Sequence, residues 1–304
     1  AMSLTKALVQ SGLLERTGLR LLGVRDETLA LIDDPAAFHD AVSRLGLATP
    51  QRRFADQVSD AAAVAEKMGY PVFVRTSGPS DPQRYGVVYN VEELRSRLTG
   101  GRLAPAANRA FCIEQALTGD REIEVVVLRD AANRMMIVAM AENVDPVGIH
   151  SGDSTTVIPA ATIGPQTRLT IEQAAFQITE HAGVSGSMHL KFAVAPDSKT
   201  VMVLAVNPMV SAMTALCDSA FGTGLASVHT RLALGLDLDE ATQGNALAQT
   251  RAAADERVVV RLPCWEFERF PGEPVKLDAR LKSTGAVFGI GGTFLEALHQ
   301  AARA

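Results

Sequence analysis

The sequence is poor in cysteine, in aromatic residues and in net charge. Its three cysteines, Cys112, Cys217 and Cys264, are odd in number and far apart, and aromatic residues make up 5% of the chain. This spacing supplies neither a disulfide framework nor a zinc site, so we expect free thiols and a cytoplasmic protein. A formal net charge of -5 argues against a nucleic-acid partner.

Long apolar runs and several well-known motifs are also missing. No stretch of about 18 apolar residues occurs, which argues against a membrane partner, and the first residues lack the order of a secretion signal. The sequence contains no P-loop, dinucleotide-binding fingerprint, metalloprotease helix or nucleophile elbow. Periodicity and spacing by themselves therefore assign no task to the protein.

The residues that are present predict a mixed helix and strand protein with a sizeable core. Of the 304 residues, 47% are hydrophobic and 21% are charged, which is enough for two or three sub-domains. Periodicity and start signals predict helices at residues 34–45, 59–69, 167–181, 217–234 and 294–303. Apolar and β-branched runs predict strands at residues 19–24, 71–75, 86–89, 111–114, 123–128, 135–141, 189–194, 201–206 and 257–262.

One segment is more specific than these patterns. Residues 142–154 read E-N-V-D-P-V-G-I-H-S-G-D-S, and this block resembles the E-N-x-D-x-x-G-[IV]-H-[ST]-G-D-S segment of carbamoyl-phosphate synthetase large chains, in their N-terminal, carboxyphosphate-forming half. Further segments follow in the family's order at residues 13–23, 69–77, 88–94, 192–194, 206–208 and 281–291. The resemblance covers nearly the whole chain in one register.

The resemblance implies an α+β fold of the ATP-grasp type, in which two α+β lobes clamp a nucleotide. It implies that residues 1–33 are a truncated remnant of a Rossmann-like pre-ATP-grasp domain. Residues 34–110 would form the N-lobe, and residues 111–304 the C-lobe with a C-terminal strand and helix extension. The cofactors of the family are ATP and Mg²⁺.

The resemblance also implies nucleotide- or anion-binding positions. Arg75 matches a phosphate-contacting arginine, and Glu122 matches a carboxylate on the ribose hydroxyls. Gln115 replaces a glutamate on the adenine side, and Leu117 is a further expected nucleotide-binding position. The loop expected to lie along nucleotide and substrate consists of Gly148, Ile149, His150 and Ser151.

Other positions depart from the family's pattern. Asn207 matches an amide metal ligand, but Ala205 stands where the family has the main metal carboxylate and Lys191 where it has a glutamine. Magnesium requires hard oxygen ligands, so a metal site here is in doubt, and Lys191 is an alternative cation facing phosphate. Met209 and Ala212 replace arginines that hold bicarbonate and phosphate.

The loop that covers the phosphates in the family also differs, as does the start of the first predicted helix. Residues 78–86 carry Pro79, Asp81 and Pro82, which remove N–H donors and add a negative charge. Pro35 stands where the resemblance predicts a basic residue.

Three functions are compatible with this mixture of kept and lost positions. The first is a paralogue with weakened or lost carboxyphosphate synthesis that binds or scaffolds beside a ligase or amidotransferase-type subunit or a second copy of itself. The second is an active ATP-dependent carboxylate–amine ligase that forms an acyl phosphate from another substrate. The third is a small-anion-binding protein that uses Arg75, His150 and Lys191.

Overall fold

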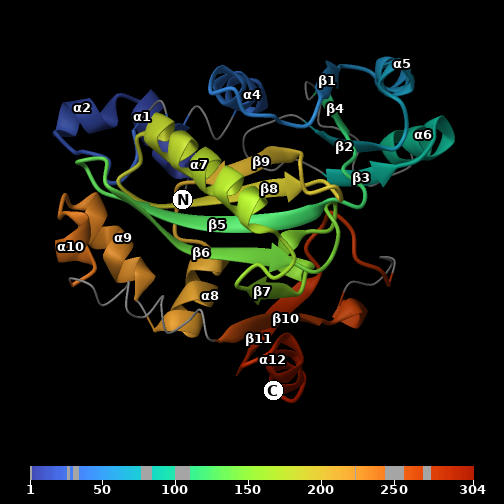
Figure 1. Cartoon of the computed structure of the whole chain (residues 1–304). Coiled ribbons are helices and arrows are strands. Elements are labelled where there is room, and N and C mark those ends of the chain that lie inside the picture. Colours follow the sequence, from blue (N-terminus) through green and yellow to red (C-terminus); the bar gives the residue numbers. More distant parts are fainter. Residues whose placement is uncertain are drawn as a thin grey trace.

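The chain is described here by a computed structural model that covers residues 2–25, 28–29, 34–76, 84–99, 110–222, 224–243, 257–269 and 275–304. Its strands form a four-stranded sheet of order β1-β4-β2-β3 and a seven-stranded sheet of order β11-β10-β7-β6-β5-β8-β9 (Figure 1). Neighbouring strands in both sheets are antiparallel. Two antiparallel sheets with helices on their faces confirm the predicted α+β, two-lobed class of fold.

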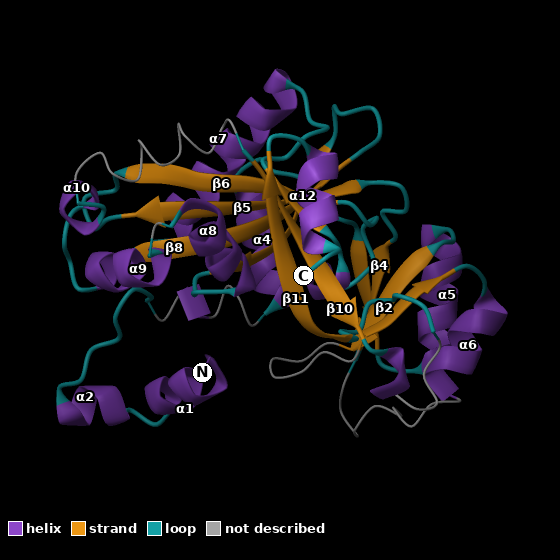
Figure 2. Cartoon of the chain, turned by 90° about the horizontal axis from the view of Figure 1, so that it is seen from below, coloured by secondary structure: helices purple, strands orange, loops and turns teal. Residues whose placement is uncertain are grey.

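The small sheet has its own core. It contains β1 (Arg52–Ala55), β2 (Val72–Thr76), β3 (Arg84–Val88) and β4 (Phe111–Gln115), with α5 (Val58–Met68) and α6 (Val91–Thr99) packed on it. Figure 2 shows both helices on the side of this sheet that is turned away from the large sheet. Val72 and Val74 alternate with half-buried residues along β2. The face with the valines packs on the helices, and the face with the half-buried residues is not covered by them.

The large sheet is covered by helices on both faces. Its strands are β5 (Arg121–Arg129), β6 (Met135–Asn143), β7 (Thr156–Ile158), β8 (Gly186–Val194), β9 (Val201–Asn207), β10 (Val258–Trp265) and β11 (Ser283–Gly291). Helix α7 (Pro165–Ala182) lies across one face, and α8 (Ala212–Phe221), α9 (Leu225–Ala233) and α10 (Leu238–Ala241) lie on the other (Figure 1). In β5, Val125 and Val127 pack with α7, whereas Val126 and Leu128 pack with α8 and α9. This central strand is therefore buried on both faces.

The remaining elements lie at the ends of the chain and in connections. These are α1 (Met2–Gln10), α2 (Leu13–Thr17), α4 (Pro35–Arg44), the 3-10 turns η1 (Ser151–Asp153) and η2 (Phe267–Arg269), and α12 (Phe294–Ala301). Helix α4 begins as predicted, since the Asp34 carboxylate caps it by accepting a bond from the Ala36 amide at 2.8 Å. Pro35, at the position where a basic residue was expected, is its first helical residue.

Some predicted elements are corrected by the structure. Residues 19–24 form no strand, and Leu19 and Leu22 are exposed. In this segment the Leu19 amide donates to the Leu14 carbonyl at 3.0 Å, and the Gly23 carbonyl accepts from the Ser185 amide at 2.9 Å. Among the described residues no strand forms a ladder with it. Helix α5 begins at Val58 after Gln57, one residue earlier than the predicted start. Strands β1, β7 and β11 were not predicted, and β11 is rich in glycine, which has a low strand propensity.

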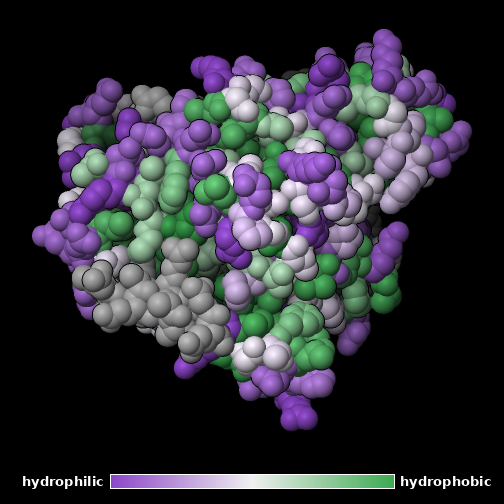
Figure 3. Space-filling model, viewed as in Figure 1, coloured by the Kyte–Doolittle hydropathy of each residue, from purple (hydrophilic) through white to green (hydrophobic). Residues whose placement is uncertain are grey.

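The limits of the two lobes stay a prediction, because β4 lies within the range assigned to the C-lobe but pairs with β1 and β2 of the small sheet. We propose that the lobes meet in the connection between Gln115 and Arg121. In the part of the chain that the structure describes, none of the helices has the length and apolar character that a membrane crossing requires. On the face seen in Figure 3, hydrophilic and hydrophobic residues are interspersed.

The contact between α12 and β11 depends on glycine and gives a first testable prediction. A Cβ atom on Gly289 would lie 1.9 Å from the carbonyl oxygen of Ala297, whereas a Cβ on Gly285 of the same strand would meet nothing within 4 Å. We expect Gly289→Ala to lower the free energy of unfolding by about 2 kcal/mol, since the helix must move away. Urea denaturation measures this, with Gly285→Ala as the matched control. Equal stability of the two variants would contradict the packing.

Candidate functional site

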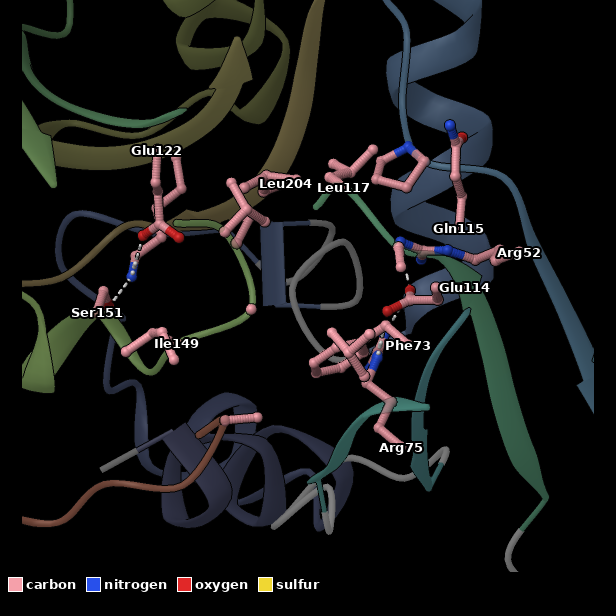
Figure 4. Close-up of a pocket in the computed structure, with 18 of the residues that line it drawn as sticks. Arg52, Phe73, Arg75, Glu114, Gln115, Leu117, Glu122, Ile149, Ser151 and Leu204 are labelled. Carbon is pink, nitrogen blue, oxygen red and sulfur yellow. Dashed lines mark hydrogen bonds and ion pairs between the residues drawn. The ribbon is translucent and has the colours of Figure 1, made fainter. Parts of the chain in front are cut away.

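A cavity of about 360 Å³ lies between the small sheet and the large sheet (Figure 4). Its lining includes most of the positions expected to bind nucleotide or anion, namely Arg75, Gln115, Leu117, Glu122, Gly148, Ile149, Ser151 and Lys191. Apolar side chains, among them Phe73, Leu204 and Val206, line it as well. The lining therefore combines flat apolar surface with charged groups at its two ends, as ligand pockets commonly do.

The small-sheet end of the cavity holds a carboxylate between two arginines. The Nε and Nη2 atoms of Arg75 each donate to a Glu114 oxygen at 3.0 Å, and Nη2 of Arg52 lies 3.0 Å from Oε1 of the same carboxylate. Burial opposes ionisation of Glu114, but the hydrogen bond and charge of Arg75 bring its pKa below the ordinary value. The fork of Arg75 is thus directed at Glu114, and a phosphate would have to compete with this carboxylate for it.

Strand pairing creates this arginine–carboxylate cluster, which was not predicted. Arg52 lies opposite Glu114 in the β1–β4 register. In the β2–β4 register Phe73 lies opposite Glu114, and Arg75 is two residues further along β2, on the same face as Phe73. The signal in the sequence was a charged residue within a short apolar segment, as at Arg75 after Val72–Val74 and at Glu114 after Phe111–Ile113.

The large-sheet end of the cavity holds a second charged cluster on β5 and β8. Met188, Leu190 and Phe192 point toward α7, so the intervening residues of β8, His189 and Lys191, point toward the opposite face. The same alternation places Glu122 and Glu124 of β5 on that face. In the β5–β8 register Glu124 lies directly opposite Lys191.

Lys191 lies among oxygen atoms. Its Nζ is 3.4 Å from Oε1 of Glu122 and 3.8 Å from Oε1 of Glu124, and it donates a hydrogen bond to the Ser151 hydroxyl. Burial raises the pKa of Glu122 although the charge of Lys191 acts against it. Burial would also raise the pKa of Glu124, but the charge of Lys191 and the hydrogen bond from His189 bring it to about 2.

The amide of Asn143 fixes both carboxylates. Its Nδ2 lies 3.0 Å from Oε1 of Glu122 and 2.8 Å from Oε1 of Glu124, and its Oδ1 accepts a bond from the Thr156 hydroxyl at 2.8 Å. Glu122, Glu124, Asn143 and Thr156 are buried, whereas Lys191 and Ser151 are half-buried. The cluster is therefore rigidly held before any ligand arrives.

The residues at the positions where the resemblance predicts metal ligands do not fit Mg²⁺. Ala205, opposite Lys191 in the β8–β9 register, offers no oxygen, and Lys191 adds a positive charge where a cation would be repelled. Asn207 lies opposite His189 and lines a smaller cavity of about 240 Å³. Within the described ranges, no group of three or more histidine, cysteine or acidic residues is arranged to hold a metal ion.

The loop of residues 148–151 is held against both sheets. Gly148 has φ of 109°, which only glycine adopts without strain, and a Cβ there would lie 3.3 Å from the Val87 side chain of β3. His150 lines the smaller cavity, and its Nδ1 accepts a bond from the Gly152 amide at 3.0 Å. Ala212, at one bicarbonate arginine position, also lines the smaller cavity.

Two regions of the predicted site remain without a structural account. Residues 77–83, which include Pro79, Asp81 and Pro82 of the expected phosphate loop, lie outside the described residues. Met209, at the other arginine position, is half-buried after β9, and it does not belong to the lining of either cavity described here.

Comparison with known sequences identifies the family. Residues 34–241 match the family model described as carbamoyl-phosphate synthase L chain, ATP binding domain. The chain is 36% identical over 305 residues to the carbamoyl phosphate synthase large chain of Rubrobacter xylanophilus, covering 99% of this chain and 29% of that protein. It is 35% identical over 307 residues to that of Archaeoglobus fulgidus, covering 100% and 28%. The chain thus spans less than a third of the length of these relatives.

Solved structures agree on the fold. The N5-carboxyaminoimidazole synthase of Aspergillus clavatus, in complex with ADP and its ribonucleotide, superposes with a TM-score of 0.71 over 97% of this chain and 77% of that one at 12% identity. The Campylobacter jejuni biotin carboxylase–ATP analogue complex gives 0.64 over 85% and 56% at 15% identity. Both are similar in fold. They show an ATP-grasp fold, and the family model and the sequence matches over nearly all of this chain show that it belongs to the carbamoyl-phosphate synthase large-chain family.

Proposed function

We propose that the cavity between the two sheets binds a nucleotide or another small anion without Mg²⁺, and that carboxyphosphate synthesis is weakened or lost. Lys191 is the single observation that carries this proposal. Its ammonium lies beside Glu122 and Glu124, on the strand next to Ala205, where the family pattern has the metal carboxylate. A fixed ammonium supplies positive charge for a phosphate but not the coordination that aligns a transferring phosphoryl group.

Other features of the cavity support the same proposal. The apolar side chains of Phe73, Leu117 and Leu204 offer surface for a flat base, and Glu122 lies within the same cavity for a sugar hydroxyl. Phosphoryl transfer depends on electrostatic neutralisation at several points. The replacement of two arginine positions by Met209 and Ala212 removes two of those points.

Calorimetry with ATP tests the proposal directly. We expect ATP to bind with the same dissociation constant in excess Mg²⁺ and in EDTA, because the Lys191 ammonium supplies the positive charge in place of a metal ion. We expect no bicarbonate-dependent ATP hydrolysis. The double variant Lys191→Gln with Ala205→Glu restores the family's residue types, and it should make ATP binding depend on Mg²⁺. If neither ATP nor inorganic phosphate binds in any condition, the proposal is wrong.

An active ATP-dependent carboxylate–amine ligase with another substrate is the second candidate. The observation in its favour is that Arg75, Glu122 and the Gly148–Ser151 loop line one cavity, although His150 lies toward the smaller one. Such an enzyme would form an acyl phosphate and transfer the acyl group to an amine. Mg²⁺-dependent ATP hydrolysis stimulated by bicarbonate or by another carboxylate would favour this candidate over the first.

A binding or scaffolding role beside a partner is the last part of the proposal. The chain matches less than a third of each large-chain relative, so in those proteins the equivalent segment is joined to much further sequence. We propose that this chain associates with a ligase or amidotransferase-type subunit, or with a second copy of itself. Analytical ultracentrifugation of the purified chain separates the two: a monomer at all concentrations excludes the second copy.

A further inference from the structure

The smaller cavity contains chemistry that nucleotide binding does not use. It lies beyond Lys191 and shares Ser151, Lys191, Ala205 and Val206 with the larger cavity. Ser211, His189 and Glu124 line only the smaller one. These three side chains come from the first turn of α8 and from two neighbouring strands, and they form one continuous hydrogen-bonded chain.

The chain of hydrogen bonds has a defined direction. Oε2 of Glu124 lies 2.6 Å from Nε2 of His189, and Nδ1 of the same ring lies 3.3 Å from Oγ of Ser211. An ionised carboxylate only accepts hydrogen bonds, so Nε2 of His189 donates to Glu124. In the tautomer that carries its proton on Nε2, Nδ1 accepts the hydrogen bond of the Ser211 hydroxyl. This is the arrangement in which a histidine removes a proton from a serine.

Both ends of this hydrogen-bonded chain are held in place. Asn143 occupies the other oxygen of Glu124 at 2.8 Å, and both Glu124 and His189 are buried. Ser211 is the N-cap of α8, in a capping box with Thr214, and its amide lies 3.1 Å from the Thr214 hydroxyl. The side chains therefore need no reorganisation to act together.

The start of α8 supplies the electrostatic part of such a site. Partial positive charge at a helix N-terminus stabilises negative charge that develops on Ser211 Oγ or on a carbonyl oxygen beside it. The N–H groups of Ala212 and Met213 are the first in the helix and, as in any α-helix, have no partner within it. Both residues line the cavity. Two such donors are what an oxyanion requires.

We propose that Ser211 is a nucleophile for acyl transfer from small anionic esters, with His189 as its general base and Glu124 as the positioning residue. The lining selects this substrate class. Met213 and Leu216 offer an apolar wall for a short acyl chain, and the volume of about 240 Å³ excludes a large one. Lys191 and Arg261 favour a negative charge on the substrate, and the Arg261 guanidinium donates to the backbone carbonyls of Ser151, Gly152 and Ser154.

The reaction balances with water as the only co-reactant. The Ser211 proton passes to Nδ1 of His189 while Oγ forms a bond to the acyl carbon. The ester C–O bond then breaks, and the leaving alkoxide takes the proton from His189. Water next attacks the acyl-serine, His189 accepts its proton and returns it to Oγ, and the carboxylic acid leaves. The net reaction is ester plus water to acid plus alcohol.

The chain contains a second serine–histidine pair, Ser187 and His229, which has no carboxylate partner among the described residues and lines no cavity described above. Oγ of Ser187 lies 3.2 Å from Nδ1 of His229, close to the 3.3 Å between Ser211 and His189, but this Nδ1 also accepts a bond from the Ser187 amide at 2.9 Å. The Ser187 side chain is buried, and the residue lines neither cavity described here. Burial lowers the pKa of His229, and no carboxylate contributes to that shift. Ser187 is therefore the control for a reactive serine.

Labelling and turnover test the proposal in the full chain. We expect phenylmethanesulfonyl fluoride to add one sulfonyl group at Ser211 and none at Ser187, located by mass spectrometry of peptides. We expect hydrolysis of the monoanionic ester 4-nitrophenyl hydrogen succinate at a rate that falls about 100-fold in Ser211→Ala and in His189→Asn. Glu124→Gln should lower kcat with little change in KM, because it keeps the hydrogen-bonding shape and removes the charge.

Three results of the labelling and hydrolysis experiments would contradict the role of Ser211. Labelling of Ser187 instead of Ser211, or no labelling of either, would overturn the proposal. So would a hydrolysis rate in Ser211→Ala equal to that of the unaltered chain. Thermal unfolding of each variant verifies that it is folded, and labelling of the unaltered protein remains decisive if a variant is not.

Discussion

Lys191→Met is expected to lower the free energy of unfolding by about 3 kcal/mol, because it leaves two buried carboxylates without their shared cation. The Lys191 side chain is 24% exposed, whereas those of Glu122 and Glu124 are 9% and 7% exposed. Solvent therefore screens only part of the interaction. Urea denaturation at neutral pH measures the loss, and Lys199→Met, at an exposed lysine in the β8–β9 turn, is the matched control.

The pH dependence of this variant separates the charge from the packing of the side chain. The pKa of Glu124 is depressed from 4.5 to about 2, so its contribution is present above about pH 4.5 and is lost as the pH falls toward 2. The difference between Lys191→Met and the unaltered chain should therefore shrink as the pH is lowered from 6 to 3. A difference that does not change with pH would assign the effect to lost packing instead.

Glu114→Gln is expected to destabilise the small sheet by a similar amount, about 3 kcal/mol, because it removes the negative charge that Arg52 and Arg75 share. The three side chains are between 7% and 17% exposed. Glu92→Gln, on an exposed position of α6, is the control. If the two variants unfold at the same urea concentration, the arginine–carboxylate cluster contributes nothing to stability.

The same variant has a second consequence that calorimetry can detect. Removing the Glu114 charge releases the fork of Arg75 toward the cavity, so inorganic phosphate should bind more tightly to Glu114→Gln than to the unaltered chain. Weaker phosphate binding in this variant would mean that Arg75 does not contribute to anion binding in the cleft.

The fold could be predicted where apolar residues follow a regular period. The strands around Val125 and Leu190 and the helix around Ile178 were predicted from that period, because their burial is set by their own residues. Leu19 and Leu22 have the same apolar character but remain exposed, since no strand in the described part of the chain pairs with them. Whether an apolar run becomes a strand thus depends on partners that lie far away in the sequence.

The site could be predicted only where a continuous motif contains it. The block that includes Gly148 and Ser151 contains residues that line the larger cavity, and their part in ligand binding stays a prediction. Glu114 and His189 were missed, because their partners Arg75 and Glu124 lie on other strands. Their importance arises from strand register and side-chain alternation, which a single sequence does not specify.

The burial of β5 on both faces affects how fast the amide hydrogens of Glu122 and Glu124 exchange with solvent. Amide hydrogens in a strand that packs on both sides exchange with solvent only when the whole domain opens, whereas those at a helix start exchange through local fraying. Glu122 and Glu124 belong to such a strand, and Ser211 to such a helix start. Hydrogen exchange should therefore be slow for the amides of Glu122 and Glu124 and faster for the amides in the first turn of α8.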